Sequence, residues 1–176
     1  MLIDIINNTK INKYLIAKIF FCSIFFFSVL YFGPVWYEHG KALVIDSKTA
    51  IDNYATRQII IGSSTFTAYV SDTNEKRIQG LSNQTELGPK KAMLFIFERS
   101  GLHTIWMKDM NFSIDIIWVN QMREVVHIVE NASPEGYRYD PPEVFKPTAE
   151  AIYIIEVKAG TVKKDGIKLG DLMSLL

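Results

Sequence analysis

Residues 103–119 read HTIWMKDMNFSIDIIWV, which places Trp106, Lys108, Asp109 and Asp115 among β-branched and aromatic residues. Such residues favour strands, and polar groups held between them are costly unless they are paired or used. This stretch is therefore where we expect a functional site, and its pattern predicts a domain built on strands.

Alternation along an extended chain decides which of these side chains share a face. Trp106 and Lys108 face one way and His103 the other, which removes His103 as a partner of Lys108. Asp115 has apolar neighbours on both sides, so its pKa is raised unless a cation or backbone N–H groups hold it. Lys108 or Arg77 is the expected cation.

Two interpretations of Asp115 follow. In the functional one, an ammonium group and a carboxylate lie beside an indole in a pocket suited to a small polar or sugar-like ligand. In the structural one, the Asp115 carboxylate caps the loop formed by residues 109–113 through backbone hydrogen bonds. The residue pattern leaves both open.

The rest of the domain shows many short strands separated by turn signals. Residues 92–97 form a continuous apolar run that predicts a central strand covered on both faces. A short helix is expected between the capping residues 71–73 and Gly80, and a single helical turn within residues 160–166 is expected to have Thr161 as its cap. Further strands are expected at residues 58–61, 65–71, 123–130 and 151–157. We therefore predict a mostly β domain, an antiparallel β-sandwich or barrel, with one or two very short helices.

Residues 131–148 contain four prolines and a glycine, which argues against a central strand or a helix. A long loop that carries its own aromatic residues is often a lid or a binding loop. Tyr137 and Tyr139 are therefore expected to cover the site.

The N-terminal part predicts a membrane anchor. Residues 14–37 are long enough to cross a bilayer as one helix, and Lys10, Lys13 and Lys18 lie at its start. The positive-inside rule keeps residues 1–13 in the cytoplasm as a tail. Residues 38–57 are then a linker, and residues 58–176 an extracytoplasmic domain. A cleaved signal peptide is the alternative, but Tyr31 and Phe32 make a poor cleavage site.

Composition excludes several classes of function. The chain of 176 residues has a formal net charge of zero and no basic stripe, so we expect no nucleic-acid binding. Its only cysteine, Cys22, lies in the apolar N-terminal run, which excludes cysteine-based zinc sites in the domain. His103 and His127 have no metal-ligand spacing, and no G-x-S-x-G elbow is present. We expect neither a metal nor a cofactor.

Six short motifs occur in the order of one known family. They are residues 74–82 (NEKRIQGLS), 92–97 (AMLFIF), 106–110 (WMKDM), 114–116 (IDI), 151–156 (AIYIIE) and 166–171 (GIKLGD). Together they resemble the domain-of-unknown-function 192 family over about residues 65–176. The resemblance implies a compact, largely antiparallel, jelly-roll-like sandwich that often follows an export signal, and no established activity.

The chain departs from the pattern of that family at three places. Asp109 stands where the family has Asn, which adds a charge beside Lys108, and Met110 stands where it has Thr. Many exported relatives carry a cysteine pair in the loop before the strand at residues 151–157. Here residues 131–148 have none, so this loop is expected to be looser than theirs.

Three functions remain as hypotheses. The first is a single-pass protein of the inner membrane whose domain, in the periplasm or outside the cell, binds a small polar ligand or an envelope component. The second is an enzyme that uses Asp115 as a general acid or base, and the third is a module that docks another envelope protein. The candidate ligand-binding residues are Trp106, Lys108, Asp109, Asp115, Arg77, Tyr137 and Tyr139.

Overall fold

The computed structural model describes residues 51, 53–139 and 141–176, so the tail and anchor expected at residues 1–37 lie outside the described residues. Among the described residues, no helix has the length and apolar character needed to span a membrane. The elements are β1 (Thr56–Ile61), β2 (Ser64–Ser71), α3 (Asn74–Gln79), β3 (Lys91–Gly101), β4 (Ile105–Trp106), β5 (Ile114–Val119), β6 (Val125–Ala132), the 3₁₀ helix η1 (Pro134–Arg138), β7 (Val144–Phe145), β8 (Ala151–Lys158), α4 (Thr161–Asp165) and β9 (Met173–Leu175).

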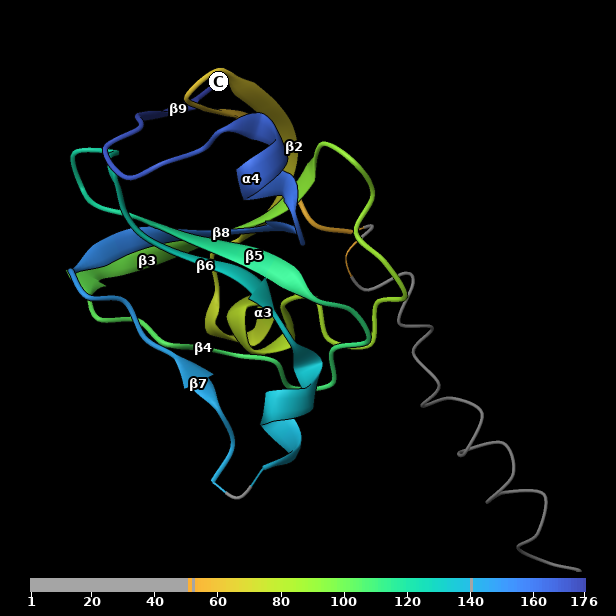
Figure 1. Ribbon diagram of the computed structural model, residues 1–176. Coiled ribbons are helices and arrows are strands. Elements are labelled where there is room, and N and C mark those ends of the chain that lie inside the picture. Colours follow the sequence, from red (N-terminus) through yellow and green to blue (C-terminus); the bar gives the residue numbers. More distant parts are fainter. Residues whose placement is uncertain (1–50, 52, 140) are drawn as a thin grey trace, which may run out of the picture. The chain divides into compact units, whose positions relative to one another are not determined.

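The mostly β prediction with very short helices is confirmed, but the sheet is mixed and is not a two-sheet sandwich. Seven strands form one curled sheet in the order β6-β5-β8-β3-β2-β1-β9, while β4 and β7 form a separate pair (Figure 1). Neighbours are antiparallel except β2 and β3, which are parallel. Between these two strands the chain crosses over through α3, whereas a tight hairpin would have made them antiparallel.

The curl of the sheet is fixed at one end by a seam between its two edges. The Val125 N–H donates to the Asp171 carbonyl (2.9 Å), the Gly170 N–H donates to the Val125 carbonyl (2.9 Å), and the Met173 N–H donates to the Arg123 carbonyl (2.8 Å). These bonds join the start of β6 to the chain entering β9. The sheet is therefore a half-barrel.

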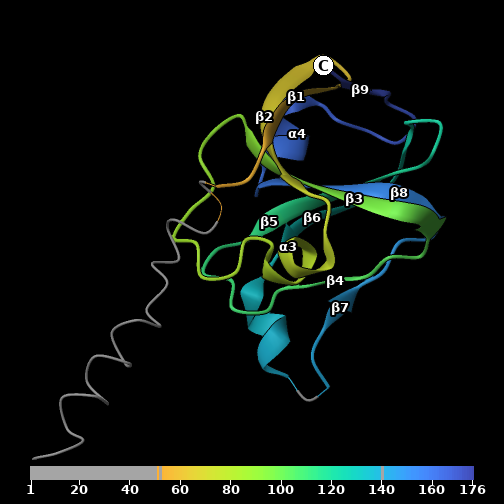
Figure 2. The same ribbon diagram turned by 180° about the vertical axis from the view of Figure 1, so that it is seen from behind.

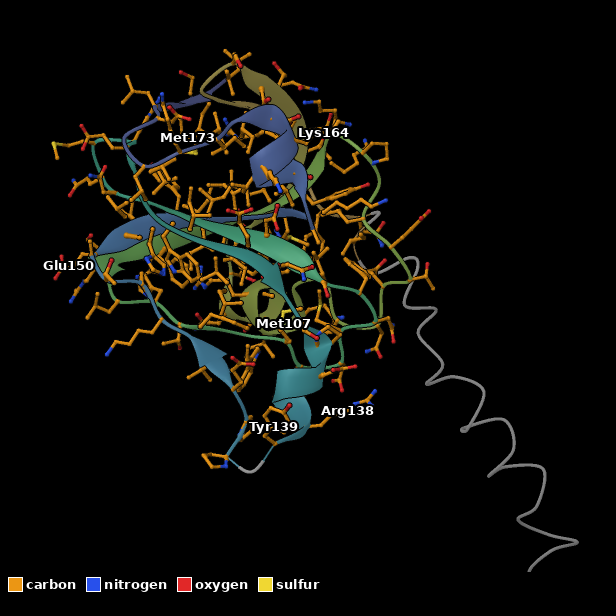
Figure 3. The ribbon with its side chains drawn as sticks, in the orientation of Figure 1. Met107, Arg138, Tyr139, Glu150, Lys164 and Met173 are labelled. Atoms are coloured by element: carbon orange, nitrogen blue, oxygen red, sulfur yellow. The ribbon has the colours of Figure 1, made fainter. Side chains whose placement is uncertain are left out.

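Each face of the sheet buries its own core, because side chains alternate along every strand. On β5, Ile117 and Val119 pack into the core on the α4 side, whereas Ile116 and Trp118 pack into the core on the α3 side. Figure 2 shows α3 and β4 against that second face. Met173 and Met107 lie on opposite sides of the sheet (Figure 3). The apolar run at residues 92–97 is confirmed as a central strand covered on both faces.

The long loop predicted at residues 131–148 forms no central strand, as expected, but it carries the short helix η1, which the prolines argue against, and the two-residue strand β7. Pro134 stands in the first turn of η1, where a missing N–H costs nothing. The two residues of β7 pair with β4. The loop is therefore tied to the stretch that contains Trp106.

Candidate functional site

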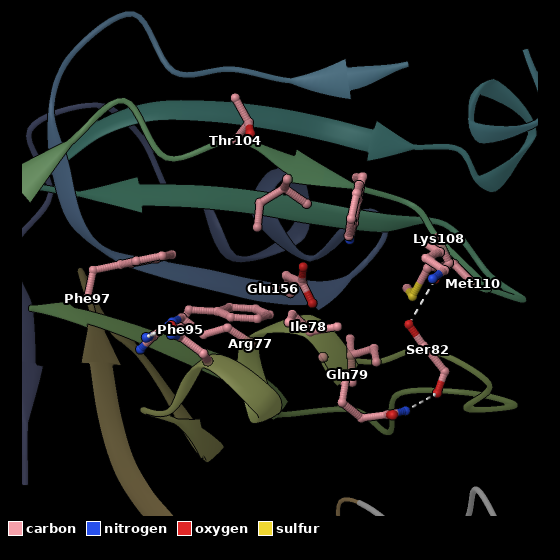
Figure 4. Close-up of a pocket in the computed structure, with 15 residues that line it drawn as sticks. Arg77, Ile78, Gln79, Ser82, Phe95, Phe97, Thr104, Lys108, Met110 and Glu156 are labelled. Atoms are coloured by element: carbon pink, nitrogen blue, oxygen red, sulfur yellow. Dashed lines mark hydrogen bonds between the residues drawn. The ribbon is translucent and has the colours of Figure 1, made fainter. Parts of the chain in front are cut away.

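A pocket of about 300 Å³ opens on the α3 side of the sheet (Figure 4). Its walls come from α3 and the chain just after it, from β3, and from the chain through β4. From β8, the lining includes a single residue, Glu156, whose side chain lies on this face of the sheet. The lining residues are Asn74, Arg77, Ile78, Gln79, Gly80, Leu81, Ser82, Phe95, Phe97, Thr104, Ile105, Trp106, Lys108, Met110 and Glu156.

Helix α3 is held at both ends as the sequence predicted. The Thr73 side chain accepts a hydrogen bond from the Lys76 N–H, which makes Thr73 the N-cap. Gly80 ends the helix with φ +45°, a conformation that favours glycine. A Cβ at Gly80 would lie 3.4 Å from the Phe95 ring. The helix end is therefore packed directly on the pocket wall.

Arg77 braces the helix against the sheet. Its Nη1 donates to the Ile96 carbonyl (2.7 Å) and its Nη2 donates to Asn74 Oδ1 (2.6 Å). The guanidinium carbon lies 5.2 Å from the centre of the Phe97 ring. Arg77 lines the pocket, but much of its hydrogen-bonding capacity is already used within the protein.

The predicted alternation around Trp106 is confirmed. Ile105 and Met107 are buried, whereas the Trp106 side chain is 47% exposed. Trp106 and Lys108 both line the pocket, and Lys108 Nζ lies 6.0 Å from the Trp106 ring centre. Tyr137 meets Trp106 edge to face with ring centres 6.3 Å apart. The structure therefore brings Trp106, Lys108 and Tyr137 to one region.

Glu156 contributes a buried carboxyl group to the pocket lining, and it was not among the candidates identified from the sequence. The residue is 4% exposed, and its Oε2 has no hydrogen-bond partner within the described part of the chain. Burial raises the pKa of Glu156 from 4.5 to about 8, so at neutral pH its carboxyl group is mostly protonated. The signal was present: an acid between Ile155 and Val157 in an apolar strand is the same pattern that singled out Asp115.

Asp115 lies on the other face of the sheet. Cross-strand pairing sets Asp115 opposite Val157 and sets Ile116 opposite Glu156. Directly opposite residues share a face, so Asp115 points into the α4-side core while Glu156 points toward the pocket. Asp115 is therefore not among the residues that line the pocket with Lys108.

The Asp115 carboxylate caps backbone groups, as the structural interpretation held, but not those of residues 109–113. Its Oδ1 accepts from the N–H groups of Asn131 (2.8 Å) and Gly160 (3.1 Å), and its Oδ2 accepts from the Val162 N–H (2.9 Å). It thereby caps α4, the role we had expected of Thr161; the N-cap residue is Gly160, which has no side-chain cap bond. Backbone N–H groups, not Lys108 or Arg77, compensate the buried charge.

Three further candidate residues lie outside the pocket lining: Tyr137, Asp109 and Tyr139. Asp109 is exposed and has φ +54°, a conformation that Asn and Asp tolerate better than other side chains. Its carbonyl accepts from the Asn83 N–H (2.7 Å), which links two loops at the edge of the site. Tyr139 is 66% exposed and follows η1.

The two histidines of the domain are engaged with aromatic neighbours. His103 stacks on Phe97 with ring centres 3.7 Å apart, and His127 meets Trp118 edge to face at 5.2 Å. Within the described residues, no cluster of three or more His, Cys, Asp or Glu side chains is placed to hold a metal ion.

Comparisons with known proteins show the family and the fold. A profile of the DUF192 family, described as an uncharacterized ACR, matches residues 57–175. A Sinorhizobium meliloti 1021 protein described as a candidate transcription regulator has a similar structure, with 24% identity over 69% of this chain and 95% of that chain, at a TM-score of 0.64. A protein of unknown function from Novosphingobium aromaticivorans DSM 12444 has 25% identity over 71% of this chain and 89% of that chain, at a TM-score of 0.65. No curated protein matches the chain.

Proposed function

The chain belongs to the DUF192 family, and we propose that its β-domain binds a small polar ligand in the pocket beside Trp106. The observation that carries this proposal is the carboxyl group of Glu156. It is almost fully buried, one of its oxygens has no partner in the described residues, and it lines an open pocket.

A buried polar group without a hydrogen bond costs about 1–3 kcal/mol. A bound molecule that pairs with Glu156 recovers this cost, so the pocket gains from being filled. Trp106 and Lys108 add an indole face and an ammonium group to the same pocket. A few polar groups converging in a mostly apolar cleft are typical of small-molecule sites.

The test uses the full-length chain, purified in mild detergent. Saccharides, peptidoglycan fragments and small organic anions are screened by thermal unfolding, because a ligand that binds only the folded state raises the melting temperature. We expect at least one class to stabilise the wild type and to lose its effect in Trp106→Ala. Met122→Ala is the matched control, since Met122 is 72% exposed and lies outside the pocket. A panel without any shift, or a shift that survives in Trp106→Ala, contradicts the proposal.

A second candidate function is general acid–base catalysis in the same pocket, with Glu156 in the role that the sequence had suggested for Asp115. A carboxyl group with a pKa of about 8 exchanges its proton near neutral pH. Mass spectrometry of each stabilising compound after incubation with the protein tests this idea. Conversion by wild type and not by Glu156→Gln supports catalysis, whereas recovery of unchanged compound supports binding alone.

We also propose that residues 14–37 anchor the domain outside the cytoplasm, in the inner membrane. The support is the apolar stretch with lysines at its N-terminal side. Fusions of the C-terminus to alkaline phosphatase and to green fluorescent protein test it in cells. An active phosphatase fusion with a dark fluorescent fusion supports the proposal, and the reverse pattern refutes it.

A further inference from the structure

Resting on this proposed function, we infer that the ligand is a small organic acid with an apolar body. Its carboxylate lies at Lys108, and an uncharged hydrogen-bond acceptor takes a bond from Glu156. Three features of the pocket lead to this ligand class: the positive charge of its lining, the apolar side chains of its walls and the protonation of Glu156.

The charge of the lining favours an anion. Among the described residues that line the pocket, Arg77 and Lys108 are the cations and Glu156 is the only acid. Arg77 already donates to the Ile96 carbonyl and to Asn74. The Lys108 ammonium group makes no hydrogen bond or ion pair within the described part of the chain, and lies 6.0 Å from the Trp106 ring centre. Lys108 is therefore the cation available to a ligand.

The walls of the pocket favour a ligand with an apolar body. Phe95 and Ile105 are buried side chains of the lining, and Ile78, Met110 and Phe97 add further apolar side chains to it. A volume of about 300 Å³ lies at the lower end of the range of small-molecule sites, roughly 300–1,000 Å³. An aromatic ring or a branched aliphatic group suits this space better than a chain of sugars.

The surroundings of Glu156 decide what it binds. Met93 of β3 and Ile116 of β5 flank it across the sheet, and the charged groups that share the pocket are Arg77 and Lys108. Its protonated carboxyl group donates a hydrogen bond to an uncharged acceptor, such as a ketone oxygen. A ligand ammonium group would need ionised Glu156 and would meet two cations of like charge, so it is disfavoured.

The experiment measures binding to the full-length chain in detergent by calorimetry. The probes are benzoylformate and trimethylpyruvate, which combine a carboxylate, a ketone and an apolar body. Benzoylformamide removes the negative charge, and phenylglycine replaces the ketone with an ammonium group. We expect both oxo acids to bind more tightly than either counterpart.

The variants separate the two polar contacts. Lys108→Ala is expected to weaken benzoylformate about tenfold and to leave benzoylformamide unchanged, as for the loss of one charged contact of about 1.4 kcal/mol. For the wild type, oxo-acid affinity is expected to fall about fivefold between about pH 8 and pH 9 as Glu156 ionises. Glu156→Gln keeps a donor and is expected to remove this pH dependence. The wild-type pH series and Lys108→Ala do not depend on that variant folding.

Several results would overturn the inference. Phenylglycine binding more tightly than the oxo acids, with affinity rising with pH, would show that Glu156 binds a cation. If Lys108→Ala loses affinity equally for benzoylformate and benzoylformamide, Lys108 does not bind the ligand carboxylate. If saccharides stabilise the protein through Trp106 and the oxo acids do not bind, the ligand class is wrong and the proposed function stands. If no probe or panel compound binds, both fail.

Discussion

Replacing Glu156 by glutamine tests the central claim about the pocket, that a buried carboxyl group there stays protonated at neutral pH. The change removes the ionisable proton and keeps the size and hydrogen-bonding character of the side chain. Because burial raises the folded-state pKa of Glu156 to about 8, its contribution to stability is fully present below its unfolded-state pKa of 4.5. That contribution is lost as the pH rises through about 8. Wild type should therefore lose stability over this range, and Glu156→Gln should not.

The magnitude follows from the size of the pKa shift. One pKa unit corresponds to about 1.4 kcal/mol, so the shift from 4.5 to about 8 bounds the whole loss at about 5 kcal/mol. Integrated between about pH 5 and pH 8, the expected loss is about 3.5 kcal/mol. Asp72 and Asp165 have pKa values lowered by hydrogen bonds from Lys76 and Lys90, so they titrate below this window.

The assay is urea unfolding of the full-length chain at several pH values within this window. Glu98→Gln is the control, because Glu98 is an exposed glutamate of β3. We expect the curves of wild type and Glu98→Gln to fall together while that of Glu156→Gln stays nearly level. Parallel curves for wild type and Glu156→Gln would refute the raised pKa and, with it, the protonated donor in the pocket.

Three further substitutions address the supports of the site. Asp115→Asn places an amide N–H₂ group against backbone N–H donors and should cost about 3 kcal/mol in urea unfolding while leaving ligand binding at the pocket unchanged. Gly80→Ala should cost about 1–2 kcal/mol, because alanine resists φ +45° and its Cβ meets Phe95; it should also weaken binding. Arg77→Gln removes the bond to the Ile96 carbonyl and should cost about 1.5 kcal/mol in the same assay.

Each of these substitutions has a matched control in the chain. Asp109→Asn changes an exposed residue with positive φ, Gly88→Ala adds a Cβ in ordinary contact with a side chain, and Arg138→Gln changes an exposed arginine. We expect all three controls to unfold within about 0.5 kcal/mol of the wild type. If Asp115→Asn folds fully but no longer binds the ligand, Asp115 belongs to the binding site after all. If Gly80→Ala or Arg77→Gln leaves the free energy of unfolding unchanged, α3 is not held as described.

The local features of the fold were predictable because short-range physics sets them. Strict alternation predicted β2, an unbroken apolar run predicted β3, and Thr73 and Gly80 predicted the ends of α3. The parallel pairing of β2 with β3 was not predictable from those signals. It depends on where the chain returns after α3, a property of the whole sheet and not of either strand.

The residues that share a face of one strand could be predicted from the sequence. Which faces of neighbouring strands come together could not. Alternation alone placed Trp106 and Lys108 on one side of the chain, and both line the pocket. The same alternation sets Asp115 on one face of β5 with Ile117 and Val119. Whether that face also holds the pocket depends on the register between β5 and β8. A shift by one residue would have set Asp115 opposite Glu156, with both acids on one face of the sheet, and no single strand encodes that register.

The strand order also determines when the domain can fold during synthesis. β8 lies between β5 and β3 in the sheet, yet it is made after both, and β1 pairs with β9 at the C-terminal end of the chain. Contacts between residues so far apart in sequence form slowly and carry a large cost of loop closure. The complete sheet therefore cannot form until β8 and β9 have been synthesised, although β1, β2 and β3 are neighbours in chain order. A chain that ended before Ala151 would leave β3 and β5 without the strand that joins them, so folding must wait for nearly the whole chain.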